Sequence, residues 1–165
     1  MVYEVKEKVC KMIKKLLLYC MLALTGLTFV SCRYDEGPFI SFTKPEDRLV
    51  GYWKLKEVYC NGAKMDSATV FANQPGNYYA FFFEGMASVS ALDSTMNIWE
   101  ESDYGGWQFE NRCKEIYVIF SLKHHKYEYT ATIKRLTRDD LIYEYNDNNG
   151  DRWRLEFESR STMYY

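Results

Sequence analysis

Residues 126–136 read KYEYTATIKRL, and apolar and polar side chains alternate along them. Successive side chains of an extended chain point to opposite faces, so one face would collect Tyr127, Tyr129, Ala131 and Ile133 and the other Glu128, Thr130, Thr132 and Lys134. The stretch therefore predicts a β-strand with one buried face. Residues 141–145 and 152–158 repeat the pattern, with Leu141, Tyr143, Tyr145, Trp153, Leu155 and Phe157 inward.

Working outward, further strands are expected wherever aromatic and β-branched residues gather between turn signals. The candidates are residues 51–56, 63–65, 78–84, 86–92, 95–101, 107–110 and 115–123. Asn61-Gly62, Gly85, Gly105-Gly106 and Asn149-Gly150 are the expected turns. Residues 67–74 could form one or two helical turns, with Asp66 or Ser67 as N-cap.

The eight short strands expected after residue 77, or nine with residues 51–56, follow in series and imply that neighbours pair in an antiparallel meander. An open sheet of that size would expose two edges that invite aggregation, whereas closure into a barrel removes both. We therefore predict an all-β fold, an antiparallel up-and-down β-barrel of about eight strands. A two-sheet sandwich is the competing architecture.

The N-terminal residues are typical of a secretory leader. Lys14 and Lys15 precede a mostly apolar run from Leu16 to Val30, which ends at Ser31-Cys32. The run is shorter than the roughly twenty apolar residues of a membrane span. Ser31-Cys32 resembles the lipobox of bacterial lipoproteins, in which the cysteine is lipidated and becomes the mature N-terminus. Met1 or Met12 could be the start.

This interpretation divides the chain into a signal peptide (1–31), a tether (32–47) and a barrel domain (48–160). The resemblance implies a lipid anchor on Cys32 that holds the protein in the cell envelope of a Gram-negative bacterium, at the outer membrane. Asp35-Glu36 resembles the export signal of surface lipoproteins, although two acids could equally keep a linker solvated.

Charge and cysteine content constrain the partners. The whole chain has a net charge of −2, of which the leader contributes +3, so the mature part is −5 and has no electrostatic reason to bind nucleic acid. We expect a monomer. Cys60 and Cys113 remain after the leader and Cys32 are set aside, and they could form a disulfide in an exported protein or stay separate thiols.

Residues 49–55, LVGYWKL, resemble the opening G-x-W strand of lipocalins, in particular the lipocalin-like domains of unknown function found in bacterial lipoproteins. The resemblance implies that Gly51 and Trp53 close one end of the barrel, with Trp53 covered by an arginine from a late strand. Arg154 or Arg152 could take that role by cation–π stacking, although strict alternation points both outward.

Catalytic constellations are hard to find, and we expect no enzyme, metal or cofactor. His124 and His125 are adjacent on an expected turn and would project to opposite faces, which makes a poor chelate. The acidic clusters at 100–103 and 139–140 are interpreted as solvated loops. Residues 147–151 lack the spaced ligands of a calcium loop.

Aromatic residues form 18% of the chain, more than a solid eight-strand core obviously needs. They suit an apolar or amphipathic small ligand. The candidate lining residues are Phe81, Phe83, Trp99, Trp107, Tyr117, Tyr129 and Tyr143; Tyr79 and Trp153 belong to the same aromatic set. Two hypotheses stay open: a small-molecule binding barrel, and a solid barrel that contacts a surface partner through its loops.

Overall fold

A computed structural model describes residues 12–15, 17, 19, 34–38, 41–92 and 98–161, with the backbone alone at positions 71, 92 and 98–100. The chain divides into two compact units, Met1–Ser31 and Cys32–Tyr165. The described residues of the first unit are helical. Across the described residues, no helix combines the length and the hydrophobicity needed to cross a membrane. Cys32, the expected lipidation site, lies outside the described residues.

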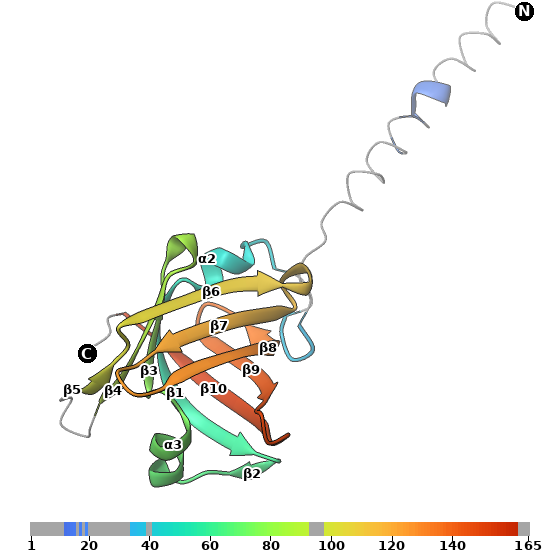
Figure 1. Ribbon diagram of the computed structural model, residues 1–165. Coiled ribbons are helices and arrows are strands. Elements are labelled where there is room, and N and C mark those ends of the chain that lie inside the picture. Colours follow the sequence, from blue (N-terminus) through green and yellow to red (C-terminus); the bar gives the residue numbers. More distant parts are fainter. Residues whose placement is uncertain are drawn as a thin grey trace, which may run out of the picture. The chain divides into compact units, whose positions relative to one another are not determined.

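The second unit is built from strands that curl into a barrel (Figure 1). They are β1 (Gly51–Cys60), β2 (Ala63–Lys64), β3 (Tyr78–Phe81), β4 (Ala87–Leu92), β5 (Ile98–Glu101), β6 (Tyr104–Glu110), β7 (Glu115–Ser121), β8 (Lys126–Leu136), β9 (Asp140–Asn146) and β10 (Arg152–Arg160). Their order in the antiparallel sheet is β5-β4-β3-β1-β10-β9-β8-β7-β6, and β2 pairs with β1. The predicted all-β antiparallel barrel is confirmed.

Two short helices mark the two ends of this barrel. Helix α2 (Pro45–Leu49) precedes β1 at one end, and helix α3 (Ser67–Asn73) follows β2 at the other (Figure 1). We call these the α2 end and the α3 end. Asp66 caps α3 by accepting a hydrogen bond from the Thr69 backbone N–H at 2.8 Å, as an N-cap aspartate commonly does.

The barrel closes where β4 meets β6. Residues 98–110 behave as one bent strand: β5 pairs with β4, the chain turns at Ser102-Asp103, and β6 then pairs with β7. An antiparallel bridge between Met86 and Gly106 joins the two edges of the sheet. The strands that form the ring are therefore β1, β3, β4, β6, β7, β8, β9 and β10, with β5 and β2 as extensions.

The expected turn at Gly105-Gly106 is wrong, because both glycines lie within β6. A Cβ atom on Gly105 would stand 2.3 Å from the carbonyl oxygen of Ala87 on β4. Real Cβ atoms do not approach that closely, so glycine is what lets the two strands meet here. The two glycines do mark a special backbone position, as predicted, but its cause is the close approach of two strands and not a turn.

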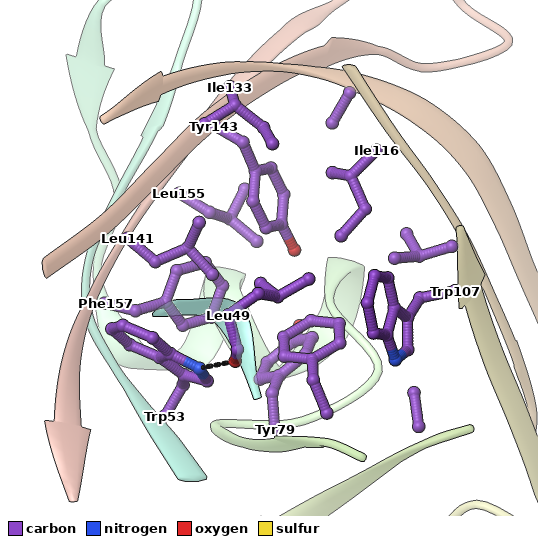
Figure 2. Packing of buried hydrophobic residues seen from close by; sticks show 14 of the residues in the cluster. Leu49, Trp53, Tyr79, Trp107, Ile116, Ile133, Leu141, Tyr143, Leu155 and Phe157 are labelled. Atoms are coloured by element: carbon purple, nitrogen blue, oxygen red, sulfur yellow. Dashed lines mark hydrogen bonds between the residues drawn. The ribbon is translucent and has the colours of Figure 1, made fainter. Parts of the chain in front are cut away.

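The core lies inside the barrel and combines large aromatic rings with leucine, isoleucine, valine and alanine side chains (Figure 2). Trp53 is fully buried near the α2 end, and its indole N–H donates to the carbonyl oxygen of Leu49 at 2.8 Å. Gly51 begins β1 at a φ of +149°, a conformation that side chains with a Cβ rarely adopt. The ring of Tyr79 meets Phe157 and Phe120 edge to face, with centroids 4.9 and 5.5 Å apart.

The segment expected to be a tether is partly docked on the barrel. Tyr34 is buried within the hydrophobic core, and the guanidinium carbon of Arg48 lies 5.5 Å from the centroid of its ring. Arg48 is itself buried and donates to the carbonyl oxygen of Leu136 at 2.7 Å. Pro45, within the expected tether, stands in the first turn of α2, where a missing N–H costs nothing.

Arg154 does not cover Trp53. Its side chain lies on the outer face of β10, where it makes two bonds to the carboxylate of Glu36, at 2.6 and 2.8 Å. It also donates to Glu156 and Glu144, at 2.8 and 3.3 Å. Alternation along the strand therefore predicted the outward position of Arg154 correctly, whereas the role over Trp53 that the resemblance implied is wrong for this residue. The arginine buried at the α2 end is Arg48, and the ring that it covers is that of Tyr34.

Candidate functional site

A cavity of about 180 Å³ lies at the α3 end of the barrel. It is bounded by the end of α3, the start of β8, the end of β9 with the following loop, and the start of β10. Its lining residues are Asn73, Lys126, Tyr127, Glu128, Tyr129, Tyr145, Asn146, Asp147, Asn148 and Trp153. Rings and polar groups share this wall, as they do in sites for small amphipathic molecules.

Three tyrosines connect the cavity wall to the interior of the barrel. The rings of Tyr129 and Tyr145 stack with centroids 4.0 Å apart and planes 13° from parallel. The hydroxyl of Tyr129 is hydrogen-bonded to that of Tyr143 at 2.8 Å. The Tyr143 hydroxyl points into the middle of the barrel (Figure 2). Alternation along β8 and β9 explains the placement, since all three residues fall on the inward faces predicted from the sequence.

Gln74, directly after α3, joins the helix to this tyrosine cluster. Its side chain is buried, and its amide exchanges hydrogen bonds with the hydroxyl of Tyr145, at 3.0 Å from the amide nitrogen and 3.2 Å from the amide oxygen. Burial is the main cause that raises the pKa of Tyr145 above its ordinary value of 10. The phenol therefore stays neutral at physiological pH and can both donate and accept.

Tyr79 completes the group of phenols from the opposite wall. It is fully buried on β3, and its hydroxyl has no hydrogen-bond partner among the described residues. Burial raises the pKa of Tyr79 well above 10, and electrostatic interactions with Tyr129, Tyr145 and Tyr127 add to the shift. A buried hydroxyl without a partner costs about 1–3 kcal/mol, so this group needs an explanation.

Charged and polar groups form the rim of the cavity. The indole N–H of Trp153 donates to Asp147 at 3.1 Å, and this bond is the main cause that lowers the pKa of the Asp147 carboxyl. Lys126 and Glu128 form an ion pair on β8. A ligand would thus meet charge at the entrance and neutral phenols further in.

The structure separates the seven predicted lining residues into different environments. Only Tyr129 lines the cavity, and Tyr143 is bonded to it. Phe81 and Trp107 pack edge to face in the core, and the Trp107 indole donates to the carbonyl oxygen of Phe82. The remaining three are Phe83, exposed in the β3–β4 turn; Tyr117, on the outer face of β7 and bonded to Glu128; and Trp99, whose side chain lies outside the description.

Four further residues at the site were not predicted from the sequence: Tyr127, Tyr145, Gln74 and Asn73. Tyr127 and Tyr145 were placed inward by alternation, and the available signal was that they share a face with Tyr129 and Tyr143 near the same strand ends. Gln74 and Asn73 had no such signal, because their position depends on how α3 packs across the end of the barrel.

Other candidate groups stand apart from this cavity. His124 and His125 lie in the exposed β7–β8 turn. Cys60 and Cys113 are thiols and do not form the disulfide that was considered, since Cys60 ends β1 at the α3 end and Cys113 lies in the turn between β6 and β7 at the α2 end. Among the described residues, no group of three His, Cys, Asp or Glu side chains could hold a metal ion.

A second hollow of about 160 Å³ lies on the outer wall, bounded by Tyr59, Gly62, Glu144, Arg152 and Arg154. Arg154 is already bonded to three carboxylates there, and Glu36 is the main cause that raises its pKa further above the ordinary value. The arginine charge is thus neutralised within the protein. The cavity at the α3 end is the better candidate for a small molecule.

An eight-strand antiparallel ring with a small cavity at one end defines an up-and-down barrel of the kind that can hold one small ligand. The family model of the lipocalin-like domain matches residues 49–143, and the chain belongs to that family. No curated protein matches the chain. Among solved structures it is similar to a redesigned β-barrel, with 9% identity and a TM-score of 0.47 over 74% of this chain and 100% of the other.

Proposed function

We propose that this chain is a non-enzymatic lipoprotein, anchored through Cys32, whose barrel binds a small amphipathic molecule at the α3 end. The observation that carries the binding proposal is the unpartnered hydroxyl of Tyr79, which is outside the cavity lining but interacts electrostatically with the lining residues Tyr129, Tyr145 and Tyr127. Natural cores rarely keep a buried donor without a partner, and a ligand hydroxyl or carbonyl would supply one. The neighbouring phenols of Tyr129 and Tyr143 offer further hydrogen bonds to the same ligand.

The dimensions of the site restrict the ligand class. A cavity of about 180 Å³ is smaller than the pockets of about 300–1,000 Å³ that hold drug-sized molecules. It suits a compact ring compound with one or two polar atoms. Because burial raises the pKa of Tyr129 and Tyr143 well above 10, the site offers neutral donors rather than charges. A polar neutral group on the ligand is therefore favoured over a deeply buried ionic one.

Native mass spectrometry of the purified mature protein tests whether a ligand is bound. We expect an adduct of constant mass that is released on denaturation. With 1-naphthol as a defined probe, binding to the folded state should raise the unfolding temperature in proportion to the logarithm of its concentration. The Asn73→Trp variant adds a ring at the cavity wall and should abolish the rise.

The matched control is Asn149→Trp, which adds the same ring in the exposed β9–β10 loop, outside the cavity lining. Its unfolding temperature should rise with 1-naphthol as in the parent protein. Loss of the effect in both variants, or an equal rise in both, would contradict binding in this cavity.

The anchor is tested separately on Cys32. Intact mass measurement of the mature protein should show a chain that begins at Cys32 and carries lipid, and that partitions into the detergent phase. The Cys32→Ser variant should be unprocessed or released without lipid. An unmodified mature chain would overturn the lipoprotein assignment and leave the ligand proposal standing.

A solid barrel that contacts a partner through its loops is the second candidate. The observation in its favour is the packing of rings in the barrel interior, where Tyr79 contacts both Phe120 and Phe157. Under this alternative no small-molecule adduct is expected, and 1-naphthol should leave the unfolding temperature of the parent protein unchanged.

A further inference from the structure

We infer that the α2 end of the barrel rests on the lipid bilayer, with Phe42, Phe83 and Met86 in contact with the membrane interface. The inference rests on the lipid anchor proposed at Cys32. It adds to that proposal an orientation and a contact surface. The α3 end, with its cavity, then faces away from the membrane.

The first argument is the length of chain between the anchor and the fold. Tyr34, two residues after Cys32, is buried in the core. Two extended residues reach at most about 7 Å. A bilayer holding the lipid on Cys32 therefore lies within about 7 Å of the point where the chain enters the barrel, because the chain between Cys32 and Tyr34 cannot extend further.

The second argument is that this entry point is fixed. We call Tyr34, Asp35 and Glu36 the N-terminal clasp. The Glu36 backbone N–H donates to the Lys134 carbonyl oxygen at 2.8 Å, and Arg135 donates to the Glu36 carbonyl oxygen at 2.9 Å. Lys134 also pairs with Asp35 at 3.0 Å, in addition to the two bonds from Arg154 to Glu36. These contacts tie the clasp to β8 and β10, so that the anchor sets the orientation of the whole barrel.

The third argument is where exposed apolar side chains gather. Among the described residues of the second unit, the exposed large apolar residues are Phe42, Phe82, Phe83, Met86 and Tyr104. Phe42 is 92% exposed just before α2, and Phe83 and Met86 are each 56% exposed in the β3–β4 turn. This turn lies beside α2 in Figure 1, because Phe81 at the end of β3 pairs with Gly51 at the start of β1.

The α3 end differs in this respect. The described side chains on its rim include Lys126, Glu128, Asp147 and Asn148. Among the described exposed large apolar residues, Tyr104 alone lies toward this end, since β6 pairs it with Ser121 and β7 pairs Ser121 with Lys126. The β1 strand of ten residues spans about 33 Å, so the two ends are well separated. Apolar rings gathered at one end, beside the anchor, are typical of a surface that enters a membrane interface.

The charges at the α2 end indicate an apolar contact rather than an electrostatic one. Lys44, Arg112, Lys114 and Arg138 are exposed there, but so are Glu46, Asp47, Glu84 and Asp139. These opposite charges offset one another, so the described residues of this end form no basic patch to bind anionic headgroups. A protein is the other occupant that would cover Phe83 and Met86, but the two-residue connection to Cys32 brings the bilayer to the α2 end, which favours the bilayer.

Site-directed fluorescence on the full lipidated protein tests the orientation. Cys60 and Cys113 are first replaced by Ser, and an NBD fluorophore is placed on Phe83→Cys, Met86→Cys, Tyr104→Cys or Asn148→Cys. The protein is reconstituted in vesicles of phosphatidylethanolamine and phosphatidylglycerol that contain spin-labelled phosphatidylcholine. We expect several-fold stronger quenching at positions 83 and 86 than at position 148, with position 104 between them. High salt should leave this order unchanged.

The outcomes separate this inference from the anchor. If the protein floats with the vesicles and carries lipid on Cys32, but position 83 is quenched no more than position 148, the orientation is wrong and the anchor stands. If intact mass shows no lipid on Cys32, the anchor is wrong and the orientation falls with it. If position 83 is shielded from aqueous iodide by a co-purified protein and not quenched by lipid, a protein partner replaces the bilayer.

Discussion

The two ends of this barrel are built on different principles. At the α2 end, buried rings are held by neighbouring groups. The Trp53 indole N–H donates to the backbone carbonyl oxygen of Leu49, and Arg48 packs over the buried ring of Tyr34. At the α3 end, phenols meet one another and a cavity remains, bounded by charged and amide side chains. One sheet thus supports an end that is sealed by buried side chains and an end that keeps a cavity with a polar rim.

Trp53→Ala should have the largest effect, because it empties the sealed end. Truncation of a fully buried tryptophan is expected to lower the free energy of unfolding by about 3–5 kcal/mol. Urea unfolding measures the change. Tyr104→Ala, at a ring that is 63% exposed, is the control and should change stability by less than about 0.5 kcal/mol. A loss below about 1 kcal/mol for Trp53→Ala would mean that the α2 end is not densely packed.

Gly105→Ala tests the seam of the barrel, the line along which β4 meets β6 and closes the ring of strands. The added methyl group would stand 2.3 Å from the Ala87 carbonyl oxygen, so β4 and β6 must separate, at a cost of about 1–3 kcal/mol. Gly106→Ala is the matched control. Its nearest contacts would be 3.4 Å away, and a clearly smaller loss of stability is expected. Equal losses in thermal unfolding would show that the seam does not depend on close approach at Gly105.

Glu36→Gln tests how much the N-terminal clasp contributes to the stability of the barrel. Arg154 is the main cause that holds the pKa of the Glu36 carboxyl below 4.5, so the folded state favours the ionised form. The stabilisation is therefore complete above pH 4.5 and is lost as the pH falls through the lower folded-state pKa. The pair is partly exposed, and we expect a difference of at most about 1 kcal/mol at pH 7.

The measurement is the free energy of unfolding of the parent and of the variant from pH 7 down to pH 3. The two curves should converge at the acid end. Asp35→Asn is the control, since its side chain is 74% exposed and should contribute much less. A difference for Glu36→Gln that grows as the pH falls would contradict the ion pair.

Tyr79→Phe should have the smallest effect and the opposite sign. It removes a buried hydroxyl that has no partner among the described residues, so the stability of the ligand-free protein should be unchanged or raised by less than about 1 kcal/mol. The same change should weaken 1-naphthol binding if the ligand bonds to this hydroxyl. Tyr143→Phe, which breaks the bond to Tyr129, is the comparison and should lower stability by about 0.5–1.5 kcal/mol.

Alternation predicted the fold well and the site only in part. The bounds of β8 and the inward faces of β9 and β10 followed from period-two patterning, because one face of each strand meets the core and the other meets water. The pattern failed in β7, where Ile116, Tyr117 and Val118 are all apolar or aromatic. Tyr117 was placed among the ligand-lining residues, yet it lies on the outer face.

The remaining errors depend on contacts between segments far apart in the chain. Gly105 looks like a turn residue until β4 is seen beside it. Glu36 looks like part of a solvated linker, but Arg154, 118 residues later, binds it. Arg48 shows no sign in the sequence that it will cover a buried ring. A local pattern carries no information on such partners, because closure of the barrel decides which of them meet.

The order of contacts along the chain has a mechanical consequence. A force applied through residues that precede Tyr34 reaches the clasp first, then α2, and only then β1. The Glu36–Arg154 pair and the bonds to β8 would take up that load, while the β1–β10 ladder is strained only after they yield. The N-terminal clasp would thus bear a pulling force on the N-terminal residues before that force reaches β1, the first strand of the sheet.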